Sequence, residues 1–320
     1  MTVNANTNET YDVSTIKEDL QDALVSISPT DTPVMSAIGR KSVDNTYFEW
    51  GVVELAAASD SNRVAEGEAA PGNDAATNAV RQGNYTQISD KVVEVSDTNN
   101  AVNGAGDAQT TAKQIAYKLK ELKRDMELML TDNVAGSAGS SGTARASAGL
   151  AAHLRTNVSR GTGGANGTTS GSGDSGYVNT AATDGTTRPI TEELLKGVIA
   201  DCWSEGAEPS VVICGPSQKQ TISTFTGNAT RFKGAEDSKL NAAIDVYVSD
   251  FGELQIVPSR FTRSRDVLVL DPNYARVAYL APTKQTPLAR TGHAERRLIS
   301  VEYGMQVDNE KAHGIIADVS

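Results

Sequence analysis

The sequence predicts an α+β fold that combines one long helix, an extended β-hairpin and a compact unit of mixed helices and strands. Residues 107–134 carry apolar side chains at helical spacing, and residues 46–98 hold two β-rich stretches on either side of a long polar one. After residue 189, helix and strand signals succeed one another. Together these three observations indicate helices packed on a mixed or antiparallel sheet.

Composition narrows the class of protein. The 320 residues carry a formal net charge of −11, which argues against general affinity for nucleic acid. Aromatic residues make up only 5% of the chain, so small residues dominate the core and we expect partners to contribute to stability. The first residues, MTVNANTNETYDVS, have no features of a signal peptide, and no apolar run is long enough for a membrane span. We therefore expect a protein made in a cytoplasm that does not bind membranes.

The N-terminal segment, residues 1–45, is predicted to be an arm rather than a domain. Thr15 and Glu18 have the spacing of a capping box. An apolar stripe then follows at helical intervals, made of Ile16, Leu20, Leu24 and Ile27. Proline-bounded SPTDTP ends this helix, and a helical turn over 33–38 with Gly39 as its cap is expected next. Two such short elements need another surface on which to dock.

Residues 46–98 are predicted to form an extended hairpin. The stretches 46–55 (TYFEWGVVEL) and 82–95 (QGNYTQISDKVVEV) have strand composition. The Ala-rich polar stretch between them has little to bury. Because an isolated hairpin is marginally stable, this one is expected to lie against another surface.

The long helix over 107–134 is the clearest element in the sequence. Asp107 is a plausible N-cap, and Gly136 follows the end. Apolar residues recur at a period of 3.6, namely Ile115, Leu119, Leu122, Met126 and Met129. At 1.5 Å per residue the helix would be about 40 Å long.

The second half reads as a folded unit that follows Gly- and Ser-rich loops, including the low-complexity loop 161–176. Thr191 is expected to cap a helix that Gly206 closes, and Pro216 is expected to open another. The predicted strands are SVVIC, DVYVS, LQIVP, VLVLD, ARVAYL, RLISVEYGMQV and GIIADV, with a turn at 250–252 joining the second and third.

No residue pattern supports catalysis, and the chain is predicted not to be an enzyme. Gly171, Gly173 and Gly176 match GxGxxG but lack the preceding apolar strand and following helix of a dinucleotide site. The three histidines are scattered, and Cys202 and Cys214 are expected to be buried reduced thiols. We therefore predict no catalytic residue, no cofactor and no metal ion.

Several segments resemble the major capsid proteins of tailed bacteriophages with the Hong Kong 97-type fold. They are spread along the chain: IKEDLQDALVSISPTDTPVMSAIGR, NTYFEWGVVELAAA, GNYTQIS, KELKRDMELML, DVYVSDFGELQIVPSRF, VLVLDPNYARVAYL and AHGIIADV. The order of arm, hairpin, long helix and α+β unit is similar to that family as well. The loop 161–176 and the hairpin tip near 60–80 resemble it least.

The resemblance implies a division of the chain into the parts of that fold. Residues 1–45 would be the N-terminal arm and 46–98 the E-loop. The peripheral P-domain would comprise 99–149, with the spine helix at 107–134, and the strands and P-loop of 281–310. The axial A-domain would comprise 150–280 and take back the final strand, 311–320.

The resemblance also implies a function and partners. The chain would assemble with itself, as pentamers and hexamers, into the icosahedral head shell that encloses the double-stranded DNA genome of a tailed phage. It would be made in the cytoplasm of a bacterial host and end in the virion capsid. The expected partners are the portal, a separate scaffold protein, possible decoration proteins, and packaged DNA without sequence-specific binding. An acidic inner wall would suit such a container, because it repels the DNA weakly.

Charged residues in the hairpin and the loops are the candidate contacts between subunits. The set is Arg63, Glu66, Glu68, Arg81, Arg231, Lys233, Arg290, Glu295 and Arg296. Arg231 and Lys233 fall in FTGNATRFKGAEDSK, residues 225–239, a candidate for the loop at the fivefold and quasi-sixfold axes. For each of these residues a solvated surface charge of little energetic value is the alternative.

Two other classes of protein remain open from the sequence alone. A bacterial surface-layer or adhesin-type binding protein would share the acidity and the Ser/Gly loops, although it would need a signal peptide. A hydrolase is the third alternative, but no set of catalytic residues can be named for it.

Overall fold

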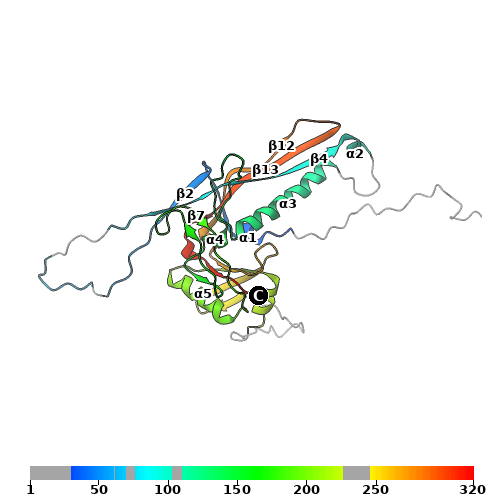
Figure 1. The fold of residues 1–320 in the computed structure, drawn as a ribbon. Helices are drawn as coiled ribbons and strands as arrows, with labels where there is room; N and C mark the ends of the chain where they lie inside the picture. The colour runs from blue at the N-terminus through cyan, green and yellow to red at the C-terminus, as the bar shows by residue number, and fades with distance from the viewer. Residues whose placement is uncertain (1–29, 61, 70–75, 103–109, 226–245) are drawn as a thin grey trace, which may run out of the picture.

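The fold is described from a computed structural model, for residues 30–60, 62–69, 76–102, 110–225 and 246–320. Two β-sheets organise the chain: a long sheet alongside the longest helix, and a shorter sheet in the rounded lower body (Figure 1). A hairpin and its loop extend from the side of the molecule opposite the start of that helix (Figure 1). The α+β class with a mixed sheet, predicted from the sequence, is confirmed.

The long sheet has four strands in the order β1-β12-β13-β4. Their bounds are Gly39–Ser42 (β1), Ala275–Pro287 (β12), Ala294–Val307 (β13) and Gln87–Ser96 (β4). β1 runs parallel to β12, and the other neighbours are antiparallel. Helix α3 (Thr111–Thr131) buries Leu122, Met126 and Leu130 in the same core as Val93 and Val95 of β4. The apolar residues at helical spacing on α3 thus pack against alternate residues of β4 in one apolar layer.

The shorter sheet has six strands in the order β5-β14-β11-β8-β10-β9. Their bounds are Val158–Ser159 (β5), Gly314–Ile316 (β14), Val267–Leu270 (β11), Val211–Cys214 (β8), Gly252–Pro258 (β10) and Val246–Ser249 (β9). Every residue of β11 is buried. Val267 and Val269 join the core of helices α5 (Glu192–Ser204) and α6 (Pro216–Ile222), whereas Leu268 joins the core of α3. Burial on both faces explains the unbroken apolar run VLVL.

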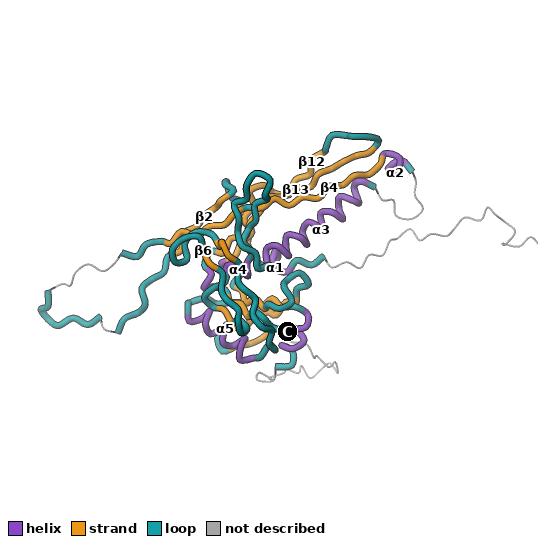
Figure 2. Tube along the Cα trace, viewed as in Figure 1, coloured by secondary structure: helices purple, strands orange, loops and turns teal. Residues whose placement is uncertain are grey.

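The smaller elements connect these layers. They are α2 (Asp97–Ala101), α4 (Leu150–His153), the hairpin strands β2 (Tyr47–Val52) and β3 (Val80–Tyr85), and the short pair β6 (Thr168–Thr169) and β7 (Val178–Thr180). Loops make up much of the segment between α3 and α5 and most of the projecting hairpin (Figure 2). Within the described part of the chain, no helix is both long and apolar enough to cross a membrane.

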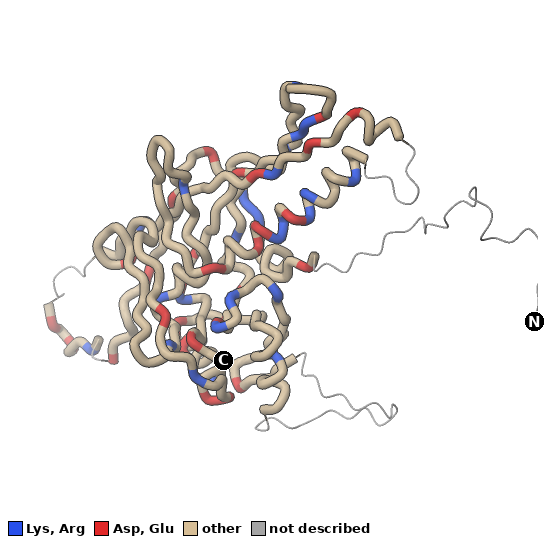
Figure 3. Tube along the Cα trace, turned by 45° about the vertical axis from the view of Figure 1, so that its right-hand side comes forward, with Lys and Arg blue, Asp and Glu red and all other residues tan. Residues whose placement is uncertain are grey.

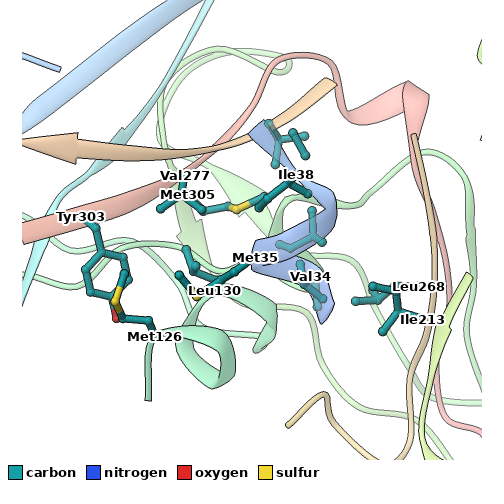
Figure 4. Packing of buried hydrophobic residues seen from close by; sticks show 14 of the residues in the cluster. Val34, Met35, Ile38, Met126, Leu130, Ile213, Leu268, Val277, Tyr303 and Met305 are labelled. Carbon is teal, nitrogen blue, oxygen red and sulfur yellow. The ribbon is translucent and has the colours of Figure 1, made fainter. Parts of the chain in front are cut away.

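Helix α1 (Pro33–Ala37) joins the N-terminal segment to the main core. Val34, Met35 and Ile38 are buried together with Leu130 of α3 and Met305 of β13 (Figure 4). The predicted helical turn over 33–38 is therefore confirmed. Gly39 is not its cap but the first residue of β1, because the chain pairs at once with β12.

Local predictions elsewhere agree with the structure in type and differ at their ends. The predicted long helix is present, but it begins at Thr111 with Thr110 as its N-cap. The proposed cap Asp107 and the predicted arm helix with its stripe both lie outside the described residues. Thr191 caps α5 as predicted, through a bond from the Leu194 N–H to its hydroxyl at 3.4 Å.

The prediction of one strand over 82–95 is wrong. β3 ends at Tyr85 and β4 begins at Gln87, and the two strands belong to different sheets. At the break, the Thr86 N–H donates to the Thr46 carbonyl at 2.8 Å and its hydroxyl donates to Glu302 at 2.8 Å. These long-range bonds turn the chain from the projecting hairpin into the long sheet.

Candidate functional site

The most prominent surface feature is the loop that joins β2 to β3. All of its described residues, 53–60, 62–69 and 76–79, are exposed. Leu55 has 86% of its surface in water and Val64 has 60%. The loop extends away from both sheets (Figure 2). Apolar side chains on a projecting segment with no core beneath them are typical of a surface that another molecule covers.

The root of the hairpin, by contrast, is firmly packed. Phe48 is buried with Val43 and with Ala278 of β12. The rings of Tyr47 and Tyr85 lie 4.8 Å apart, and Tyr177 contacts Tyr85 edge-on at 4.9 Å. The surface on which the base of the hairpin lies is thus the chain's own long sheet, because Phe48 packs there against Ala278.

Asn84 is the polar centre of this root. It is fully buried, and its amide nitrogen donates to the Met305 carbonyl at 2.7 Å and to the Ala148 carbonyl at 3.1 Å. Its side-chain oxygen accepts from the N–H groups of Ala148 at 2.9 Å and Tyr85 at 2.8 Å. One amide thus joins the hairpin, the segment before α4 and strand β13. The direction of the projecting loop depends on this junction.

Glu127 provides a second junction, between α3 and the N-terminal segment. Its buried carboxylate accepts from the N–H groups of Val34 at 2.7 Å and Met35 at 2.9 Å. Burial raises the pKa of Glu127, and the two backbone bonds oppose that rise. These two bonds hold the start of α1 against helix α3.

A network of charges holds the C-terminal segment. Asp318 is fully buried, accepts from the Gly161 N–H at 3.0 Å and pairs with Arg265 at 2.6 Å. Arg263 pairs with Asp184 at 2.6 Å and Asp266 at 3.0 Å. Burial raises the pKa of Asp266 to about 6, against the lowering effect of Arg263. These pairs join the loops around Gly161, Asp184 and Arg263 to the C-terminal segment.

Four of the nine predicted contact residues have partners in their own chain. Arg81 pairs with Glu49 across the hairpin, and Arg290 pairs with Asp97 at 3.1 Å. Glu295 pairs with Arg297 at 2.6 Å, and Arg296 with Glu94 at 3.2 Å. The distant partners of Arg81, Arg290 and Arg296 could not be read from the sequence, whereas Arg297 lies two residues from Glu295 on the same strand.

The other five predicted contact residues divide into two groups. Arg63, Glu66 and Glu68 are exposed in the projecting loop, where Glu68 accepts from the Ala65 N–H at 2.9 Å. Arg231 and Lys233, with the candidate axial loop around them, lie outside the described residues. Arg63, Glu66 and Glu68 are thus the described members of the set that are exposed and form no ion pair within the described part of the chain.

Both cysteines and two of the three histidines are buried, whereas His293 is exposed. Burial raises the pKa of Cys202 to about 12 and that of Cys214 to about 11. It lowers the pKa of His153 to about 3 and that of His313 to about 4. Among the described residues, no group of three or more His, Cys, Asp or Glu side chains could hold a metal ion.

Sequence reasoning missed Asn84, Glu127 and Asp318. One signal was available for Glu127: it falls on the apolar side of the long helix, next to Met126 and Leu130. Asn84 and Asp318 carry no local signal. Apart from the neighbouring Tyr85 N–H, the side-chain partners of Asn84 are 63 to 221 residues away, and those of Asp318 are 53 to 157 residues away.

Comparison with known proteins gives consistent matches across the whole chain. A family model described as SU10 major capsid protein matches residues 3–320. The major capsid protein of Escherichia phage Phieco32 is 26% identical over 326 residues, which cover 91% of this chain and 90% of the phage protein.

Solved structures share the fold at low sequence identity. The capsid structure of the cyanophage P-SCSP1u has a TM-score of 0.63 at 11% identity, covering 96% of this chain and 93% of its own. Mycobacterium phage Adephagia gives 0.62 at 9% identity, with 98% of both chains covered. An encapsulin complex of Synechococcus elongatus gives 0.57 at 11% identity, covering 95% of this chain and 93% of its own. The described architecture is thus the Hong Kong 97-type fold.

Proposed function

This chain belongs to the SU10 major capsid protein family, and from that membership we propose that its copies assemble as pentamers and hexamers into an icosahedral phage head. It is a structural protein of the virion capsid that associates with itself to form a shell. The surface-layer or adhesin alternative has no support in the family match.

The observation that carries the proposed assembly is the exposed apolar loop on a rigid root. Leu55 and Val64 are largely in water, whereas Phe48 and Asn84 fix the base from which the loop projects. A segment of this kind gains apolar burial only when a second molecule covers it. We infer that it lies over a neighbouring copy, with Arg63, Glu66 and Glu68 among the contacts.

The parts of the fold are assigned by sheet. The P-domain comprises α3 and the long sheet, and the A-domain comprises the six-stranded sheet with α5 and α6. Two boundaries differ from those expected from the sequence. β4 (Gln87–Ser96) goes with the P-domain rather than the E-loop, and the P-domain strands begin at Ala275. The final strand, β14, pairs with β11 in the A-domain sheet.

The further partners we propose are a portal, a separate scaffold protein and, where present, decoration proteins. The enclosed genome is double-stranded DNA, held without sequence-specific contacts. The net charge of −11 supports weak repulsion of the DNA by the shell as a whole. Each subunit contacts several neighbours at once, so many contacts that are individually modest give a stable shell.

Shortening the loop tests the proposal. Residues 55–77 are replaced by Asn-Gly, which keeps the register that pairs Val52 with Val80 and closes β2 and β3 with a two-residue turn. We expect the variant to keep the urea midpoint of the unassembled chain, because the described residues removed bury nothing, and to form no closed shells by sedimentation and negative-stain microscopy.

Point changes refine the same test. Leu55→Ser with Val64→Ser removes the apolar groups and should lower the yield of shells, whereas Asp60→Ser changes a polar residue of the same loop and should not. Normal shells from the shortened chain would contradict the role given to the loop.

A further inference from the structure

A groove with a basic rim lies beside α3 on the side of the N-terminal segment. The cavity measures about 570 Å³ and lies between α1, β1, β12 and α3. Arg40, Lys41 and Lys123 line it with positive charge. The half-buried Tyr279 and the edges of the buried Met35 and Met126 form its apolar floor. We call these six residues the basic groove.

The positive charges of the groove are not neutralised within the described part of the chain. The acidic residues of α3 are engaged elsewhere: Glu121 pairs with Lys118 at 2.8 Å and Asp125 with Lys91 at 2.6 Å, while Glu127 is buried on backbone N–H groups. In contrast, no described carboxylate forms an ion pair with any groove cation or with the two cations beside it on α3, Lys120 and Arg124. Lys and Arg recur along this helix and next to it (Figure 3).

An acidic segment with an apolar stripe fits such a groove. Residues 9–28 contain five acidic residues and one lysine, a net charge of −4. The acids are Glu9, Asp12, Glu18, Asp19 and Asp22, and the apolar stripe is Ile16, Leu20, Leu24 and Ile27. The acids match the rim, and the stripe matches the surface formed by Met35, Met126 and Tyr279.

Position in the chain makes this segment the favoured occupant. The described chain begins at Thr30, and Met35, which lines the groove, follows five residues later. A tether this short holds the segment at millimolar effective concentration beside the groove. We propose that residues 9–28 bind in the basic groove of their own chain. DNA phosphates would also be attracted to the cations, but they make no use of the apolar surface.

Hydrogen exchange followed by mass spectrometry tests this on the full-length, unassembled chain at low concentration. The triple variant Arg40→Glu, Lys41→Glu, Lys123→Glu should speed exchange in peptides within 9–28 about tenfold, because attraction becomes repulsion at several positions. The triple variant Glu18→Lys, Asp19→Lys, Asp22→Lys should do the same. Combining both triples should bring exchange back to within about twofold of the natural chain, because opposite charges again face each other.

Arg63→Glu is the control, since it makes one substitution of the same kind on the projecting loop and should leave exchange in 9–28 unchanged. Three results would overturn the proposal: exchange unaffected by the first triple, protection that appears only in assembled shells, or loss of binding to a labelled DNA duplex with exchange in 9–28 unaltered. Because the unassembled chain is used, failure here is distinct from failure to form shells.

Discussion

Asn84 should be among the most sensitive positions in the chain. Replacing it with alanine removes the bonds to the Met305 carbonyl, the Ala148 carbonyl and the Ala148 N–H, at 2.7, 3.1 and 2.9 Å. The bond to the Tyr85 N–H at 2.8 Å is lost as well. All of these lie at the root of the projecting hairpin, so the change loosens three segments at once.

The size of the effect follows from the partners that lose a bond. Each buried polar group left without a partner costs about 1–3 kcal/mol, and a relaxed site recovers part of that cost. Three of the four partners are buried and the Tyr85 N–H is only partly so; for the three buried groups, Asn84→Ala should lower the free energy of unfolding by about 3–6 kcal/mol. Asn84→Asp should cost more at neutral pH, because a carboxylate oxygen would replace the amide donor that faces the Met305 carbonyl.

Equilibrium urea unfolding of the unassembled chain, followed by tryptophan fluorescence, measures this loss. With a slope of about 3 kcal/mol per molar urea, the midpoint of Asn84→Ala should fall by about 1–2 M. The deficit of Asn84→Asp should shrink as pH falls, because a buried carboxyl has a raised pKa and its folded form gains stability when it is protonated. Asn62→Ala and Asn62→Asp make the same changes on the exposed loop and should leave the midpoint unmoved.

Two results would refute the reasoning. A loss below about 1 kcal/mol for Asn84→Ala would mean that water or rearranged neighbours satisfy the exposed partners. Equal behaviour of the alanine and aspartate variants at every pH would mean that the site is not desolvated.

Three further predictions follow from buried groups and close contacts. Burial lowers the pKa of His153 to about 3 in the folded chain, so the free energy of unfolding should decrease as pH drops below about 6.5. In urea titrations between pH 6 and 4, His153→Gln should make this decrease smaller by about 1.4 kcal/mol per pH unit. The thiols of Cys202 and Cys214 should react with a disulfide reagent only after denaturation, and rapid labelling of the native chain would contradict their burial. Gly149→Ala should destabilise the fold by several kcal/mol, because its Cβ would clash with the Asp132 carbonyl oxygen. Gly197→Ala, in an open helical position, should instead stabilise the fold by about 0.5–1 kcal/mol, and equal thermal midpoints for the two variants would be inconsistent with this.

The parts of the fold that the sequence predicted are those governed by near neighbours. The helix ending at Thr131 follows from the period of its apolar residues, and the start of α5 follows from the Thr191 cap. The α+β class and the strands of the second half follow from composition and alternation. The resemblance of scattered segments to phage capsid proteins predicted the family. The family model, which matches residues 3–320, then established it, and the similarity to the Phieco32 protein agrees with it.

The parts that only the tertiary structure decided depend on residues far apart in the chain. The division of 82–95 at Thr86 comes from bonds to Thr46 and Glu302, so periodicity along the strand could not reveal it. The same holds for the buried junctions at Asn84 and Glu127 and for the ion pairs of Arg290 and Arg296. Their partners come from helices and strands far away in the sequence. Local sequence sets which backbone conformation is favourable, whereas the pairing of remote polar groups is set by where packing of the two sheets brings them.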